Sequence, residues 1–126
     1  HIVVCGHTDC GAMKGAINPA ALSDLPHVKD WLDHARAAVE TVKAKVGQAT
    51  VAELDQITEE NVLLQLQHLK THPVVAAKLA TGEIELHGWV YDIKHGSVRA
   101  YDEDKQAFVE AEERYAALLA QSNQAA

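Results

Sequence analysis

The sequence has few cysteines and no long apolar run, and each shortage excludes a class of protein. Two cysteines in 126 residues, both among the first ten positions, are too few for a secreted domain that is stabilised by several disulfide bonds. No secretory leader pattern precedes them. No stretch approaches the roughly 20 consecutive apolar residues that cross a bilayer. We therefore expect a soluble, cytoplasmic protein without a membrane partner.

Positive charge is also scarce. Eleven Lys and Arg residues stand against 18 Asp and Glu residues, which gives a formal net charge of −7, and the basic residues are scattered along the chain. Nucleic-acid-binding domains carry clustered positive charge, so we expect no nucleic-acid partner. A chain of this length can bury roughly two thirds of its unfolded surface, which suits one domain over residues 1–126.

The first half of the chain has the pattern of a strand followed by helices. Residues 2–5 form a short β-branched run without alternation, which predicts a parallel strand covered on both faces. A helix is expected over residues 9–17 and a loop over 18–26. Apolar residues at helical spacing then predict a helix from Val28 that ends just before Gly47.

The second half begins with a capping signal. Thr50 and Glu53 form a possible capping box, and a long helical pattern follows until Pro73, which suits the first turn of a short helix. Alternation over residues 83–93, a turn at 94–97 and a second strand at 98–101 predict a β-hairpin. A final helix is expected over residues 103–119, before a frayed tail.

These elements predict an α/β fold with a partial parallel β-sheet, flanked by helices and followed by a C-terminal β-hairpin and helix. The strands are too few to close a sheet alone, so another chain or an upstream segment should supply the rest. The chain also begins at His1 without a methionine and with one residue ahead of a strand. We therefore expect it to be part of a longer protein.

The clearest chemical signal is the segment Gly-His-Thr-Asp-Cys-Gly at residues 6–11. Ligands gather at the carboxyl ends of strands in open α/β sheets, where His7 and Cys10 are expected to lie. A helix N-terminus favours the thiolate form of Cys10, and an imidazole with a thiolate suits Zn²⁺. Because zinc needs at least three protein ligands in a catalytic site, a third must come from elsewhere.

Other interpretations of the same region remain open. Cys5 within the strand is expected to be a small buried hydrophobe, and a Cys5–Cys10 disulfide is disfavoured by the turn between them. Asp9 is expected to cap the following helix, or else to orient His7. His27 and His34 are expected at the surface, and His87 as a hydrogen-bonded structural residue or proton shuttle. None of the other histidines is expected to be the third zinc ligand.

Two motifs carry a resemblance to a known family. VVCGHTDCGAMKGA at residues 3–16 and ELHGWVYDIKHGSV at residues 85–98 closely resemble the β-class carbonic anhydrases of the bacterial type. The resemblance implies that His7 and Cys10 ligate Zn²⁺ and that the backbone of Gly11 borders the substrate pocket. It also implies reversible hydration of carbon dioxide to bicarbonate by hydroxide generated at the zinc, in a homodimer or homotetramer. Tyr91 matches a tyrosine of a noncatalytic bicarbonate pocket in that family.

One part of the family pattern is absent. Cys-x-Asp-x-Arg, which supplies the third zinc ligand and an Asp/Arg pair, does not occur in these residues. The chain therefore resembles the C-terminal portion of such an enzyme. The alternative, from another functional class, is a noncatalytic α/β module that dimerises or binds zinc without turnover.

Overall fold

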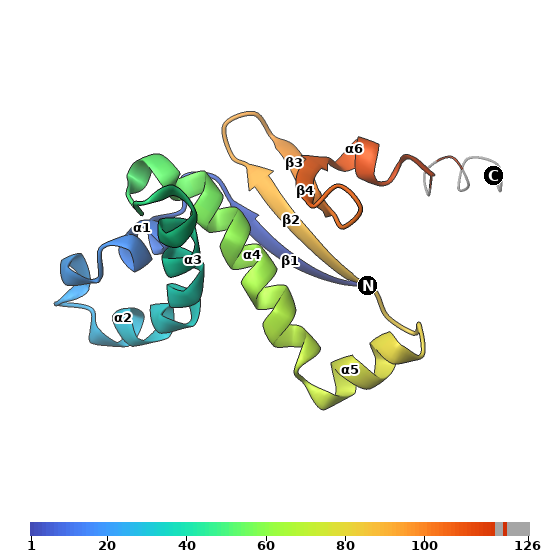
Figure 1. Cartoon of the computed structure of the whole chain (residues 1–126), viewed down its shortest axis with the longest axis horizontal. Coiled ribbons are helices and arrows are strands. Elements are labelled where there is room, and N and C mark those ends of the chain that lie inside the picture. Colours follow the sequence, from blue (N-terminus) through green and yellow to red (C-terminus); the bar gives the residue numbers. More distant parts are fainter. Residues whose placement is uncertain (118–119, 121–126) are drawn as a thin grey trace.

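The fold is built on one mixed four-stranded sheet with the strand order β1-β2-β3-β4 (Figure 1). A computed structural model describes residues 1–117 and 120. The strands are β1 (Ile2–His7), β2 (Leu86–Asp92), β3 (Ser97–Asp102) and β4 (Ala107–Glu110). β1 and β2 are parallel, whereas β2, β3 and β4 form an antiparallel meander. The α/β fold class and the hairpin that the sequence predicts are confirmed.

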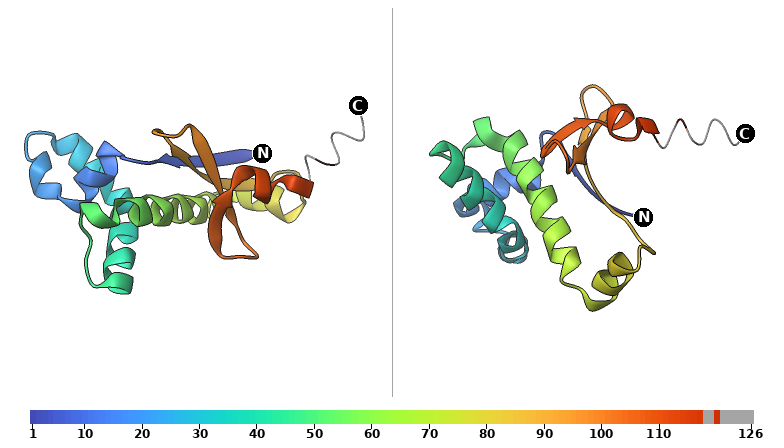
Figure 2. Two further views of the ribbon diagram at one scale, coloured as in Figure 1. Left: turned by 90° about the horizontal axis from the view of Figure 1, so that it is seen from above. Right: turned by 45° about the vertical axis from the view of Figure 1, so that its right-hand side comes forward.

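Six α-helices connect and cover these strands within the described residues. They are α1 (Gly11–Ile17), α2 (Pro26–Leu32), α3 (Arg36–Val46), α4 (Leu54–Lys70), α5 (Pro73–Ala80) and α6 (Ala111–Arg114). Figures 1 and 2 show α1, α2 and α3 gathered beyond the carboxyl end of β1, with α4 running back along the sheet. None of the helices in the described part of the chain is long and apolar enough to cross a membrane.

Two glycines allow α4 to lie close against the sheet. A Cβ added to Gly6 would stand 2.9 Å from the side chains of Thr58 and Val62. A Cβ added to Gly88 would stand 3.0 Å from Val62 and Leu66. Both positions therefore need glycine for the helix to approach at this distance.

The buried side chains form two clusters, one at the start of α4 and one further along it. One lies between α4 and the sheet and includes Val62, Leu66 and Val90. The other joins α4 to the helices at the carboxyl end of β1, and its buried members are Met13, Ala35, Val39, Val42, Leu54 and Ile57. Since α4 contributes to both clusters, it connects the sheet to the helical end of the molecule.

The face of the sheet turned away from α4 is largely uncovered. Exposure alternates along β1, where Val3 is 40% exposed and Cys5 is exposed. On β2, Tyr91 is 41% exposed. The expectation that β1 is covered on both faces, with Cys5 buried, is therefore wrong for this chain, because α4 covers one face only.

The helix expected from Val28 is interrupted. A 3₁₀ turn over Asp33–Ala35 separates α2 from α3. Val28 and Trp31 on α2 are 44% and 72% exposed, whereas Ala38 on α3 is 1% exposed. The apolar residues therefore do not form one continuous buried stripe, and the 3₁₀ turn changes the direction of the chain.

The helix expected over residues 103–119 is wrong at its start. Residues 103–106 form a turn and Ala107–Glu110 form strand β4, so helix α6 begins only at Ala111. Residues 118, 119 and 121–126, which include the end of the expected helix and the tail, lie outside the described part of the chain.

Several local signals are confirmed. Thr50 and Glu53 form the predicted capping box ahead of α4, with Glu53 also receiving the Thr50 backbone N–H at 2.9 Å. Gly47 ends α3 in the left-handed conformation at φ 85°. Pro73 stands in the first turn of α5.

Candidate metal centre

The loop from His7 to Cys10 lies at the carboxyl end of β1, as the sequence predicts. His7 is the last residue of β1, and α1 begins at Gly11 with Cys10 as its N-cap residue. The three residues between the end of the strand and the helix turn the chain sharply. Asp9 makes this turn in the left-handed conformation, with φ 55°.

The His7 ring is oriented by its own loop. Its Nδ1 lies 2.9 Å from the backbone oxygen of Thr8, and the residue is half-buried. A histidine that donates Nδ1–H to a carbonyl keeps the lone pair on Nε2 free, which is the usual arrangement of a metal-ligating imidazole. The position and tautomer that this contact favours fit a ligand role for His7.

Thr8 fixes the loop to the end of β2. Its backbone N–H donates to the Tyr91 oxygen at 2.9 Å, and its hydroxyl accepts the Ile93 N–H at 3.1 Å. Sequence reasoning missed this residue, because nothing in the pattern indicates that a loop threonine pairs with a hairpin 85 positions away. Thr8 thus holds the His7–Cys10 loop against the end of β2.

Cys10 and Asp9 have different environments. Cys10 is half-buried and packs against the cluster that contains Met13, and both cysteines of the chain are free thiols. Asp9 is exposed and does not cap α1, so that expectation is wrong. Its carboxylate instead pairs with Lys14, and this contact lowers the pKa of Asp9 below its ordinary value.

The other two predicted site residues lie next to this loop. Tyr91 is the Cα partner of His7 in the parallel pairing of β1 and β2, so the two residues lie side by side on one face of the sheet. Gly11 is the exposed first residue of α1, and an added Cβ there would meet no atom within 4 Å. Open space therefore borders Gly11.

The described residues place no third ligand beside His7 and Cys10. Among residues 1–117 and 120, the one cluster of three metal-ligating side chains consists of His1, Glu85 and His87, near the opposite end of β1. His7 and Cys10 supply an N and S donor pair that suits zinc, but fewer ligands than a catalytic zinc site requires.

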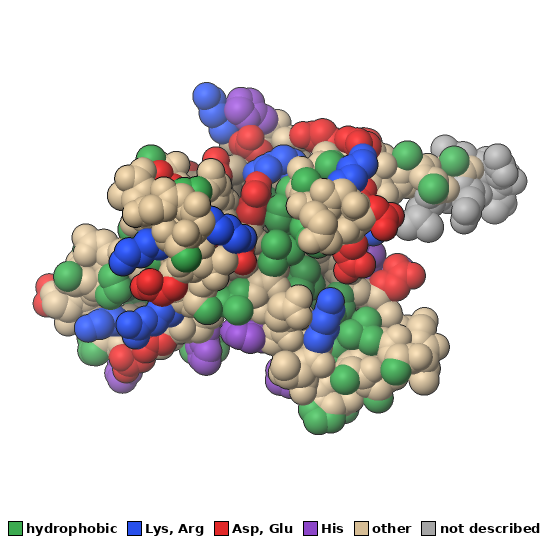
Figure 3. All heavy atoms as spheres, in the orientation of Figure 1, with side chains coloured by type: hydrophobic (Ala, Val, Ile, Leu, Met, Phe, Trp, Pro, Cys, Tyr) green, Lys and Arg blue, Asp and Glu red, His purple; other side chains and the backbone are tan. Residues whose placement is uncertain are grey.

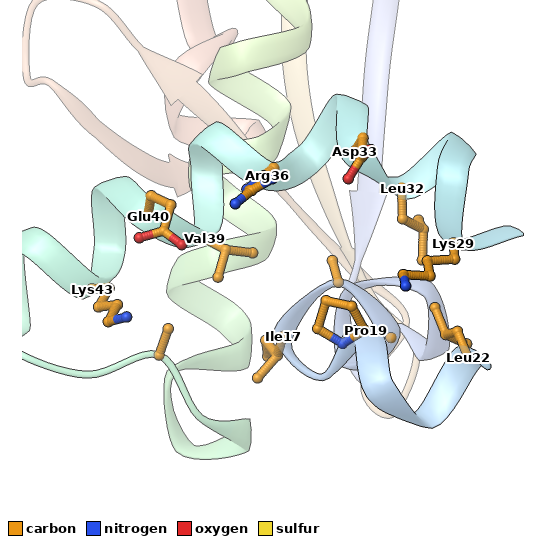
Figure 4. Close-up of a pocket in the computed structure, with 13 residues that line it drawn as sticks. Ile17, Pro19, Leu22, Lys29, Leu32, Asp33, Arg36, Val39, Glu40 and Lys43 are labelled. Atoms are coloured by element: carbon orange, nitrogen blue, oxygen red, sulfur yellow. The ribbon is translucent and has the colours of Figure 1, made fainter. Parts of the chain in front are cut away.

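A separate pocket lies at the helical end of the molecule. It has a volume of about 370 Å³ and is bordered by α1, α2 and α3, with side chains of both charges around it (Figure 4). None of the predicted site residues lines it. The face in Figure 3 likewise shows Lys and Arg side chains interspersed with Asp and Glu.

Comparison with known proteins places the chain in a family. The sequence profile described as carbonic anhydrase matches residues 1–98. The carbonic anhydrase of Pseudomonas aeruginosa is 47% identical over 108 residues, which cover 86% of this chain and 49% of that protein. The carbonic anhydrase of Synechocystis sp. is 40% identical over 119 residues, 93% of this chain and 43% of that protein. The chain thus spans about half the length of these relatives.

Solved structures agree with the sequence match. The β-carbonic anhydrase CcaA superposes with a TM-score of 0.81 at 40% identity, over 86% of this chain and 54% of that one. A Coccomyxa β-carbonic anhydrase superposes with a TM-score of 0.67 at 28% identity, over 97% of this chain and 58% of that one. The residues matched by the family profile include the His7–Cys10 loop and strands β1 and β2. The chain belongs to the β-carbonic anhydrase family.

Proposed function

We propose that this chain is the C-terminal portion of a zinc enzyme that interconverts carbon dioxide and bicarbonate. The observation that carries the proposal is the His7–Cys10 loop, where an imidazole held through Nδ1 and a thiol at a helix start follow one strand. Family membership supports the reaction, and the N and S donors support zinc. When bound, zinc acts as a Lewis acid that lowers the pKa of a water toward 7.

The residues of this chain have distinct parts in the proposed enzyme. His7 and Cys10 hold the metal, with Cys10 as the thiolate. The Thr8 backbone oxygen keeps His7 Nε2 available, while the Thr8 hydroxyl anchors the loop to β2. Gly11 borders the substrate pocket, where a side chain is absent. Tyr91 on the neighbouring strand contributes to a noncatalytic bicarbonate site.

The site requires residues beyond those described here. Zinc needs a third protein ligand, and the sequence contains no Cys-x-Asp-x-Arg segment. The unpaired edge of β1 and the uncovered face of the sheet leave room for an additional strand or subunit. We therefore propose that the protein forms a homodimer or homotetramer. We also propose a cytoplasmic location, with no nucleic acid or membrane as partner.

The test is made in the natural full-length protein. We expect His7→Ala and Cys10→Ser each to remove tight zinc binding and carbon dioxide hydration together, because each deletes a ligand. Metal content and stopped-flow hydration rates measure the two effects. Cys5→Ser is the matched control, since Cys5 is an exposed cysteine outside the loop, and it should leave both unchanged. Retention of zinc by both loop variants would refute the assignment.

The alternative function is a noncatalytic module. It is favoured by one observation: the described residues place no third metal ligand beside His7 and Cys10. A full-length protein that binds zinc through His7 and Cys10 but hydrates carbon dioxide no faster than a buffer control would establish this alternative.

A further inference from the structure

We propose a second metal site, formed by His1, Glu85 and His87, that takes Zn²⁺ or a similar divalent transition metal. It lies at the amino ends of β1 and β2, where the chain begins beside the start of β2 (Figure 1). The His7–Cys10 loop is at the carboxyl end of β1, so the two sites are separate.

The three donor atoms have the spacing of ligands around one small ion. His1 Nδ1 lies 2.9 Å from His87 Nε2 and 3.4 Å from Glu85 Oε2, and the latter two atoms are 3.7 Å apart. A point about 2 Å from all three atoms exists, which is the usual length of Zn–N and Zn–O bonds. The donors therefore already surround a position that zinc would occupy.

The backbone explains why these side chains meet. Ile2 pairs with Leu86 in the parallel register, and the Ile2 N–H donates to the Glu85 oxygen at 2.9 Å. This pairing brings the residue before β1 next to the start of β2. Glu85 and His87, two positions apart, flank Leu86 and reach toward His1 from the same side of the strand.

A second layer of contacts orients His87. Its Nδ1 lies 3.0 Å from Tyr115 Oη, which also accepts the Trp89 indole N–H at 2.8 Å. When His87 donates Nδ1–H to Tyr115, its Nε2 carries the lone pair that accepts a hydrogen bond from His1 Nδ1 and that a metal could use instead. The His87 side chain is only 14% exposed, so this ring is held in place before metal arrives.

The donor set selects the class of metal. Two imidazole nitrogens and one carboxylate oxygen suit Zn²⁺, Co²⁺ or Ni²⁺ better than Mg²⁺ or Ca²⁺, which prefer oxygen ligands. His1 and Glu85 are exposed, so solvent can reach the remaining coordination position. Bound metal would join β1, β2 and, through Tyr115, the segment after α6.

The test removes the first site and measures the second. In the His7→Ala/Cys10→Ser variant of the natural full-length protein, we expect calorimetric titration with Zn²⁺ to show one equivalent bound. Glu85→Gln, an exposed and nearly isosteric change, should weaken this binding by about tenfold or more, as should His1→Ala and His87→Gln. His27→Ala, which removes an exposed histidine outside the cluster, should change nothing.

A second measurement separates the three-residue site from zinc binding by a single histidine. The imidazole of His1 or His87 could hold zinc without Glu85, and then Glu85→Gln would bind as tightly as its parent. That result would overturn the proposal, as would the absence of binding in the parent variant. Zinc should also raise the melting temperature of the parent but not of Glu85→Gln, because metal held by both strands stabilises the fold.

Discussion

Gly6 is a position of close contact between β1 and α4. An added Cβ would stand 2.9 Å from Thr58 and Val62, and Val62 is 1% exposed, so neither neighbour has free space to move into. We expect Gly6→Ala to lower the free energy of unfolding by about 1–3 kcal/mol, the usual cost of overpacking a core. Urea denaturation followed by circular dichroism measures this change.

Gly11→Ala is the matched control for Gly6→Ala. No atom lies within 4 Å of an added Cβ at Gly11, and the residue is already helical. Alanine there should be neutral, or should stabilise the chain by about 0.4–1 kcal/mol through the unfolded state. Equal effects of the two substitutions would contradict the argument that Gly6 is a contact between strand and helix.

Single residues also show what the sequence could predict of the site. The positions of His7 and Cys10 at a strand end and a helix start follow from local pattern alone. The role of Thr8 does not, because its partners are backbone groups at and just after the end of β2, far along the chain. The exposure of Cys5 could not be predicted either, since an apolar strand looks the same whether one or both faces are covered within the chain.

At the scale of elements, a repeated turn explains the one strand that the sequence did not reveal. Tyr91-Asp92 and Tyr101-Asp102 each begin a tight turn in which the aspartate oxygen accepts two backbone N–H groups. In the first turn Gly96 takes the left-handed conformation, and in the second Gln106 does so at φ 52°. Glycine marks the first turn, whereas glutamine at the equivalent position gives no such signal.

Strand pairing explains why the helix expected over residues 103–119 is wrong at its start. Phe108, Ala111 and Tyr115 have helical spacing, but Phe108 pairs with Tyr101 across β3 and β4. Pairing with a neighbouring strand therefore outweighs local periodicity at this position. By contrast, the hairpin of β2 and β3, the start of α5 and the end of α3 all carry their own local signals, and these are confirmed.

The capping box ahead of α4 has a predictable pH dependence. Hydrogen bonds from Thr50 and Gln48 lower the pKa of Glu53 below its ordinary value of 4.5. A carboxyl with a lowered folded pKa stabilises the fold fully above its ordinary pKa and loses that contribution as pH falls through the folded value. We expect Glu53→Gln to be less stable than wild type above pH 4.5 and the difference to shrink in more acidic solution.

Thermal melting of both proteins across this pH range tests the prediction. Glutamine keeps one acceptor oxygen, so the substitution removes the charge and one acceptor but little volume. Asp55→Asn is a suitable control, because Asp55 is an exposed acidic residue in the first turn of α4 outside the capping box. A stability difference for Glu53→Gln that is constant down to pH 3 would show that the carboxylate charge has no part in the cap.

In the molecule as a whole, the sheet is covered on one face only and extended by further strands at one edge of β1 and β2 only. α4 covers one face, and β3 and β4 extend one edge, whereas the other edge of β1 has no neighbouring strand in the described sheet. On the uncovered face, Val3 and Tyr91 are 40% and 41% exposed. Exposed strand edges and apolar faces favour association with further chain, which is how larger sheets are completed.

This asymmetry predicts that the chain associates through β1. We expect sedimentation velocity to show a dimer or larger species at micromolar concentration, and Val3→Lys to shift it to monomer because a charge on the uncovered face opposes its burial. Val74→Lys is the control, since Val74 is a more exposed valine on α5, away from that face. A wild-type chain that sediments as a monomer would exclude self-association. Equal dissociation by both variants would instead point to net charge, since each substitution adds one positive charge to the formal net charge of −7.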